Sequence, residues 1–246
     1  MDRMLYIAMN GAKQNMLAQT ANTNNLANVS TTGFRADFAG FRSMPVFGLG
    51  HPTRAYAMAE RPGIDLNPGG LNTTGNPLDI AVDGDGYIAV QAKDGSEAFT
   101  RAGNLRLTST GLLINASGVP VMGDAGPISL PPANAVEIAK DGTVSIIPQG
   151  QPATDIQVVG RIKLVNPPAS EIYKGNDGLL RLKSGEIPVA NANVNLVSGA
   201  LEMSNVNIAE ALVNMINSAR EFELHVKLMK TADEHAEREM QFVRLG

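Results

Sequence analysis

The residues best suited to chemistry in this chain of 246 residues are a few scattered polar side chains. Asp83-Gly84-Asp85-Gly86 has the start of a calcium-loop pattern, but the remaining ligands and the terminal Glu of such a loop are absent. We interpret these residues as paired turns. His225 and His235 do not have the i, i+4 spacing of a helical metal pair, and His235 with Glu239 is interpreted as a solvated helix face.

Motifs for nucleophilic catalysis or phosphate binding are missing as well. The sequence has no G-x-S-x-G, Walker loop or G-x-G-x-x-G, and without cysteine it has neither thiolate chemistry nor Cys-ligated metal. Arg101 follows Phe99-Thr100 and suggests an anion site, but nothing beside it in the sequence completes one. A polysaccharide-acting β enzyme would need two carboxylates at one site, and aromatic platforms that 4% aromatic residues hardly provide. We therefore expect no enzyme, no catalytic, metal or cofactor-binding residues, and no cofactor.

Composition restricts the partners of the protein. The net charge of −4 gives no basic footprint for nucleic acid. The segment from Gln14 to Gly33 is uncharged but rich in amides, which excludes a membrane span. The apolar run from Met4 to Met9 is too short for a cleaved secretory signal. We expect no nucleic acid, no membrane insertion and, if the protein leaves the cytoplasm, a route without a cleaved signal.

These side chains must be positioned by a larger framework, and its clearest part is the C-terminal segment 204–246. Asn207 and Glu210 give an N-x-x-E cap signature, and no Pro interrupts the residues that follow. An apolar stripe with the 3.5-residue period of a coiled coil then runs along the segment. Its positions are Ile208, Leu212, Met215, Ala219, Phe222, Val226, Met229, Asp233, Ala236, Met240 and Val243. A stripe this narrow predicts a long helix that lies against another helix.

The N-terminal segment supplies a partner helix. The same spacing gives Leu5, Met9, Ala12, Met16, Gln19, Thr23 and Leu26, so the stripe turns polar in its second half. We expect the two terminal helices to pack as a coiled coil. This packing could form an ordinary intramolecular hairpin without any role in assembly. We favour assembly, because the amide-rich half needs more partners than one helix offers.

The middle of the chain consists of two segments with different sequence patterns. Phe34 to Asn76 contains many Pro and Gly residues and is predicted to be an extended arm rather than a flexible linker, because it is unusually rich in Phe. Leu78 to Leu201 contains short alternating runs separated by five Asp-Gly pairs, which predicts an antiparallel β domain. The predicted fold is α+β. Its domains are an N-terminal helix (1–33), an extended arm (34–76), an antiparallel turn-rich β domain (77–203) and a C-terminal helix (204–246).

Several stretches resemble the bacterial flagellar rod, hook and hook-associated family. Two terminal stretches resemble its N- and C-terminal signatures, Ala21-Asn22-Thr23-Asn24-Asn25-Leu26-Ala27-Asn28-Val29-Ser30-Thr31-Thr32-Gly33-Phe34 and Ser204-Asn205-Val206-Asn207-Ile208-Ala209-Glu210-Ala211-Leu212-Val213-Asn214-Met215-Ile216. Four internal stretches resemble the inner β segment of rod members, Gly69-Gly70-Leu71, Thr74-Gly75-Asn76-Pro77-Leu78-Asp79, Gly84-Asp85-Gly86-Tyr87 and Phe99-Thr100-Arg101-Ala102-Gly103-Asn104. The resemblance covers most of the chain and is specific in combination. The chain looks most like the F-type members of the proximal rod, although its tail departs from the usual rod ending at Glu234-His235-Ala236-Glu237-Arg238-Glu239.

The resemblance implies a structural subunit of the flagellar basal-body rod, which serves as drive shaft and export conduit. Its partners would be copies of itself and other rod proteins in a periplasmic helical assembly, together with the flagellar type III export apparatus. The alternatives are a distal-rod or hook-related axial protein, or another β-rich filament protein of phage-tail type. Three sets of residues are expected at interfaces: Leu5, Met9, Ala12, Met16, Asn24, Asn25, Leu26 and Asn28 on the N-terminal helix; Ile208, Leu212, Met215, Ala219, Phe222, Val226 and Met229 on the C-terminal helix; and Phe34, Phe38, Phe41 and Phe47 for docking of the arm.

Overall fold

The computed structural model describes residues 3–38, 40–45, 55–60, 63–152 and 154–245. The chain forms two compact units, each with contributions from separate parts of the sequence. Unit 1 comprises residues 1–28, 36–65 and 206–246, and unit 2 comprises residues 29–35 and 66–205.

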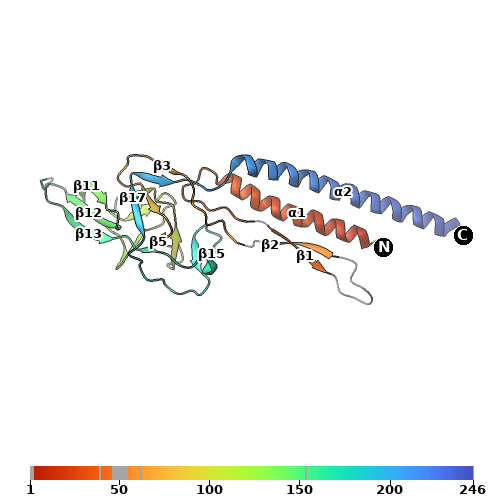
Figure 1. Cartoon of the computed structure of the whole chain (residues 1–246), viewed down its shortest axis with the longest axis horizontal. Helices are drawn as coiled ribbons and strands as arrows, with labels where there is room; N and C mark the ends of the chain where they lie inside the picture. The colour runs from red at the N-terminus through yellow and green to blue at the C-terminus, as the bar shows by residue number, and fades with distance from the viewer. Residues whose placement is uncertain (1–2, 39, 46–54, 61–62, 153, 246) are drawn as a thin grey trace. The chain divides into compact units, whose positions relative to one another are not determined.

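Unit 1 contains two long helices, α1 (Arg3–Ala27) and α2 (Ile208–Leu245), which lie side by side and antiparallel (Figure 1). Helix α2 begins as its cap signature predicts. The Asn207 side-chain oxygen accepts hydrogen bonds from the backbone N–H groups of Ala209 at 3.0 Å and Glu210 at 3.3 Å. These bonds satisfy two of the donors that a helix start leaves free.

A two-stranded antiparallel sheet also belongs to unit 1. Strand β1 (Gly40–Pro45) pairs with β2 (Ala55–Glu60), so these two parts of the segment predicted as an extended arm form a sheet. The Asn10 side chain of α1 donates a 2.7 Å hydrogen bond to the carbonyl oxygen of Ala57 in β2. Amides of α1 therefore satisfy backbone groups of the segment that follows it.

Unit 2 is built from short antiparallel strands (Figure 1). The largest sheet has the order β14-β5-β6-β16-β15, a second has the order β11-β12-β13, and four more pair two strands each: β17-β4, β18-β3, β7-β8 and β10-β9. The strands of unit 2 are β3 (Leu71–Thr73), β4 (Ile80–Asp83), β5 (Tyr87–Gln91), β6 (Glu97–Thr100), β7 (Leu105–Leu107), β8 (Leu113–Asn115), β9 (Met122–Gly123), β10 (Gly126–Pro127), β11 (Ala133–Ile138), β12 (Thr143–Pro148), β13 (Gln157–Arg161), β14 (Leu164–Val165), β15 (Ile172–Lys174), β16 (Leu180–Leu182), β17 (Asn195–Ser198) and β18 (Ala200–Glu202). A single turn of 3₁₀ helix, η1 (Ala169–Glu171), precedes β15.

The core of unit 2 consists of aliphatic side chains from these sheets. The glycines of all five Asp-Gly pairs have positive φ, as tight turns between strands require. Fully buried core residues include Ile80, Ile88, Val90, Leu113, Val121, Val144, Ile146, Ile162, Val165 and Leu196. Unit 2 therefore has a continuous hydrophobic core of its own.

The class α+β agrees with this architecture, but the predicted coiled coil does not. Most of the regular elements are short strands in small antiparallel sheets, and several of the bulky residues expected between the helices are exposed. Met9 and Met16 are more than half exposed, as is Ile208, and Leu212 is 44% exposed. The physical reason is that the two helices meet through smaller residues. Among the described residues, no helix is long and apolar enough to cross a membrane.

Candidate assembly surfaces and a buried ion cluster

Helices α1 and α2 pack through small side chains. The buried residues are Ala8, Ala12, Asn15 and Ala21 on α1 and Ala211 and Ala232 on α2. Gly11 of α1 faces His225 of α2, and a Cβ atom added to Gly11 would lie only 2.4 Å from the ring carbon Cε1. The helices therefore come close together because a glycine leaves room for an imidazole ring.

Two amides of α1 form hydrogen bonds with α2. The Asn15 side chain donates to Glu221 Oε2 at 3.0 Å, and the Asn22 side chain donates to the carbonyl oxygen of Ala211 at 2.7 Å. Within the described residues, Asn15 Oδ1 and His225 Nδ1 are buried in this contact without a hydrogen-bond partner. The amide-rich composition of α1 is thus partly explained by contacts inside one chain.

The predicted interface residues of α1 divide between covered and exposed positions. Ala12 is buried, while Asn25, Leu26 and Asn28 are half-buried. The exposed members are Leu5, Met9, Met16 and Asn24. The neighbouring Met4, Tyr6 and Leu17 are exposed as well, so α1 presents an apolar face to solvent.

The predicted interface residues of α2 divide in the same way. Ile208, Leu212 and Ala219 are exposed, and four residues are half-buried, namely Met215, Phe222, Val226 and Met229. Other large apolar residues are also exposed along α2, namely Val213, Ile216, Leu224, Leu228 and Met240. Exposed apolar patches on folded proteins are typical of interaction sites.

The four phenylalanines predicted for arm docking lie in different surroundings. Phe34 belongs to unit 2 and is half-buried, with the Lys174 ammonium group 3.9 Å from its ring centroid, which is a cation–π contact. Phe38 and Phe41 belong to unit 1 and are 49% and 57% exposed. Phe47 lies outside the described residues.

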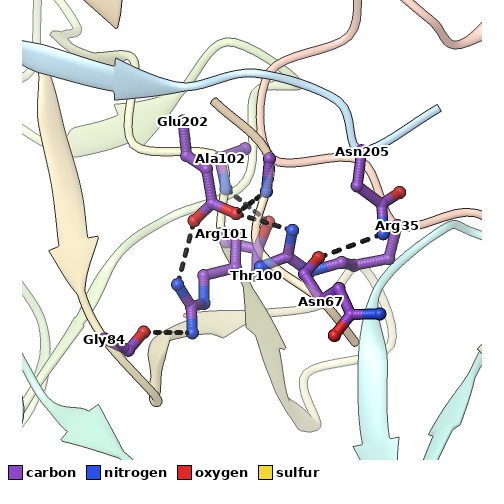
Figure 2. Close-up of polar contacts among 9 residues, drawn as sticks. Arg35, Asn67, Gly84, Thr100, Arg101, Ala102, Glu202 and Asn205 are labelled. Atoms are coloured by element: carbon purple, nitrogen blue, oxygen red, sulfur yellow. Dashed lines mark hydrogen bonds and ion pairs between the residues drawn. The ribbon is translucent and has the colours of Figure 1, made fainter. Parts of the chain in front are cut away.

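Unit 2 contains a buried ion cluster (Figure 2). Glu202 at the end of β18 is 1% exposed and forms ion pairs with two guanidinium groups. Its Oε2 lies 2.9 Å from Arg101 Nη1, and its Oε1 lies 2.6 Å from Arg35 Nη1, a close ion pair without hydrogen-bond alignment. The backbone N–H of Gly69 donates to the same Oε1 at 3.0 Å. One carboxylate thus joins three separate stretches of the chain.

Two of the joined stretches, together with the one that carries Glu202, are those by which the chain enters and leaves unit 2. Residues 29–35 follow α1, residues 66–70 begin the second stretch of the unit, and residues 200–205 precede α2. The backbone N–H of Gly33 donates to the carbonyl of Glu202 at 2.8 Å, and the Asn205 side chain donates to the carbonyl of Asn67 at 3.1 Å (Figure 2). These bonds tie the entry and exit segments to one another.

Glycine is required where these segments approach closely. Gly33 has φ +66°, and a Cβ atom there would lie 2.3 Å from the backbone carbon of Arg101. At Gly69, a Cβ atom would lie 2.0 Å from the carbonyl oxygen of Met203. A larger residue at either position would push the segments apart.

Arg101 completes its contacts inside unit 2. Its Nη2 donates to the carbonyl of Gly84 at 2.8 Å, and its guanidinium carbon lies 5.2 Å from the Tyr87 ring centroid. Burial raises the pKa of the Tyr87 hydroxyl above its ordinary value, while Arg101 and Arg35 oppose that rise. The anion suggested beside Arg101 is therefore the protein's own Glu202, and the Asp83–Gly86 segment supplies a carbonyl to the arginine. Within the described residues, no group of three or more His, Cys, Asp or Glu side chains could hold a metal ion.

Sequence reasoning missed Arg35 and Glu202. The two residues stand far apart in the chain, and a lone charge in a segment of mixed composition carries no local signal. The indirect signal was Arg101, an arginine within the apolar β segment that needs a buried counterion.

Comparison with known proteins gives consistent matches. A family model described as "Flagellar basal body rod FlgEFG protein C-terminal" matches residues 197–241, and one described as "Flagellar hook protein FlgE/F/G D1 domain" matches residues 81–146. The chain is 42% identical to the flagellar basal-body rod protein FlgF of Escherichia coli and 41% identical to that of Salmonella typhimurium, over 100% of both chains in each case. It is 32% identical to the flagellar basal-body rod protein FlgG of Bacillus subtilis, over 94% of this chain and 96% of the relative.

Proposed function

The chain belongs to the flagellar basal-body rod protein family as a structural subunit of F type, and we propose that its place is the proximal rod. The observation that carries this proposal is the 42% identity with FlgF over the full length of both chains. A distal-rod role is the second candidate, supported by the weaker, 32% identity with FlgG.

In the rod, copies of the chain stack with each other and with other axial proteins through the terminal helices. A heterologous contact that does not close into a ring produces an open helical filament. The surfaces for this contact are the exposed apolar residues of the helix pair, chiefly Leu5, Met9 and Met16 on α1 and Ile208 and Leu212 on α2. Full burial of an exposed side chain of this kind stabilises a contact by roughly 1.5–3 kcal/mol, and these residues, which are already partly covered, contribute about half of that each.

The exposed phenylalanines extend the same proposal to the arm. Phe38 and Phe41 are apolar, exposed and close to strand β1, so they suit docking onto a neighbouring subunit. Such docking would stiffen the rod against torsion. Phe34, which is held beside Lys174 in unit 2, anchors the beginning of the arm.

The subunit acts as a mechanical part and not as an enzyme. The assembled rod transmits torque across the periplasm and encloses the conduit through which the flagellar type III apparatus exports unfolded chains. The subunit itself leaves the cytoplasm by the same apparatus. The low charge of α1, with two basic and no acidic residues from Arg3 to Ala27, suits a surface that unfolded chains pass without binding.

Deletion of the gene, followed by negative-stain imaging of purified basal bodies, tests the proposed place. We expect rings without a rod, and restoration of the rod by the parent gene. Basal bodies with a complete proximal rod that lack only the distal segment would favour the second candidate. Basal bodies of normal appearance would contradict both.

A further inference from the structure

Helix α2 has two sides that could pack against α1. The bulky side includes Ile208, Leu212 and Ile216, all exposed. The small side includes Ala211 and Ala232, both buried, together with Ser218 and His225. Since burial of apolar area is what drives association, the bulky side has more to gain from contact with α1. The structure nevertheless buries the small side.

Hydrogen bonds favour the small side. The Asn15 side chain donates a hydrogen bond to the Glu221 carboxylate, and the Asn22 side chain donates one to the carbonyl oxygen of Ala211. Successive residues of a helix point about 100° apart. Turning α2 by one residue would therefore carry both acceptors away from these amides.

Shape favours the same side. The His225 ring occupies the space that a side chain on residue 11 would fill, and only glycine leaves that space open. Asn15 Oδ1 and His225 Nδ1 remain without partners in the described residues, so the contact is not optimised for stability alone. Buried polar groups of this kind act in helix pairs by selecting one register over others.

We propose that Gly11 and Asn22 form a rotation lock with His225, which holds the small side of α2 against α1, and that the Asn15–Glu221 contact reports its state. The lock keeps the bulky side of α2 free for the contacts between copies proposed above, and to that extent it rests on the proposed function. The residues named here thereby determine which face of the helix pair is available for assembly.

Cysteine crosslinking within the full-length free chain tests the lock, because the native sequence contains no cysteine. One reporter pair is Asn15→Cys with Glu221→Cys, whose native side chains touch at 3.0 Å. The matched pair, Asn15→Cys with Phe222→Cys, reports a helix turned by one residue. We expect the first pair to crosslink severalfold faster, because residues 15 and 221 face each other in the native contact and a disulfide forms only between close Cβ atoms.

Substitutions in the lock should change the ratio of the two crosslinking rates. Gly11→Ala should reduce the ratio of the two crosslinking rates severalfold, and adding His225→Ala should restore it, because the second change removes the ring that the new Cβ meets. Asn22→Leu should lower the ratio as well, while Asn24→Leu, at an exposed amide of the same helix, should leave it unchanged. If helix propensity alone determined the contact, the first pair would crosslink as fast or faster after Gly11→Ala, because alanine has a higher helix propensity than glycine.

A second measurement reports the solvent exposure of the bulky side. Leu212→Cys, at a position that is 44% exposed, should react with a maleimide in the parent chain and become protected when Gly11→Ala allows α2 to turn. Equal crosslinking of both pairs in the parent chain would overturn the proposal, as would a ratio indifferent to Gly11→Ala and Asn22→Leu. Neither measurement involves a rod, so failure here is distinct from failure of the proposed function.

Discussion

Removing the charge of Glu202 should destabilise unit 2 severely. Glu202→Gln keeps the size of the side chain but leaves the guanidinium groups of Arg35 and Arg101, both buried, without a counterion. Removing one partner of a buried ion pair costs about 3–5 kcal/mol of unfolding free energy. Because unit 2 contains about 150 residues, each kcal/mol corresponds to roughly 4 °C, so we expect the melting temperature to fall by about 10–20 °C.

Asp177→Asn is the matched control for this experiment. It also removes one carboxylate that pairs with an arginine, Arg181, at 2.7 Å, but Asp177 is 39% exposed. An ion pair on the surface contributes only about 0–1 kcal/mol, so the control should melt within a few degrees of the parent. Thermal denaturation followed by circular dichroism measures the melting temperature of both variants, and urea denaturation measures their unfolding free energy. A loss for Glu202→Gln no larger than that of the control would refute the assignment of Glu202 as the counterion that joins the segments.

Three further predictions concern other parts of the chain. Gly33→Ala should destabilise unit 2 by more than 1 kcal/mol in the same denaturation assay, since its Cβ would lie 2.3 Å from backbone, whereas Gly95→Ala, also at positive φ but in open space, should cost less. Burial raises the folded-state pKa of Tyr87 above 10.0, so the stability that its neutral hydroxyl contributes is complete below pH 10 and is lost as the pH rises toward the folded-state pKa. Tyr87→Phe should therefore remove this alkaline loss of stability in melting curves recorded at increasing pH. A Tyr87→Phe variant with the same alkaline melting profile as the parent would argue against this role of Tyr87. Serine at both Phe38 and Phe41 should impair motility without lowering export of the subunit, as measured by swimming and secretion assays; unimpaired swimming would count against docking of the arm.

The sequence predicted those features that depend on neighbouring residues. Asn207 caps α2 because its side chain reaches only two and three residues ahead. The Asp-Gly pairs form turns because glycine alone adopts positive φ without cost, and Gly84, Gly95 and Gly142 all do so. The alternation at Val144 and Ile146 marks a strand with one face in the core.

Features that depend on distant residues were not predicted. A search for a helix stripe gives weight to bulky apolar residues and therefore selected Leu212, whereas the helices meet through Ala211 and a glycine–histidine contact. The sequences of strands β1 and β2 alternate only weakly between apolar and polar residues, and each strand depends on the other for its backbone hydrogen bonds. Glu202 carries no local signal, because its role depends on two arginines from other parts of the chain.

As a rod subunit, the chain should contact neighbouring subunits through the exposed faces of its helices. Maleimide labelling of Met9→Cys and Met16→Cys, at positions 53% and 56% exposed in the single chain, tests this claim. Each variant is labelled as free subunit, in purified basal bodies, and in basal bodies dissolved in denaturant as a control. We predict rapid labelling of the free subunit, protection in the basal body and recovery after denaturation. Equal labelling of free and assembled protein, or absence of the chain from basal bodies, would contradict the claim.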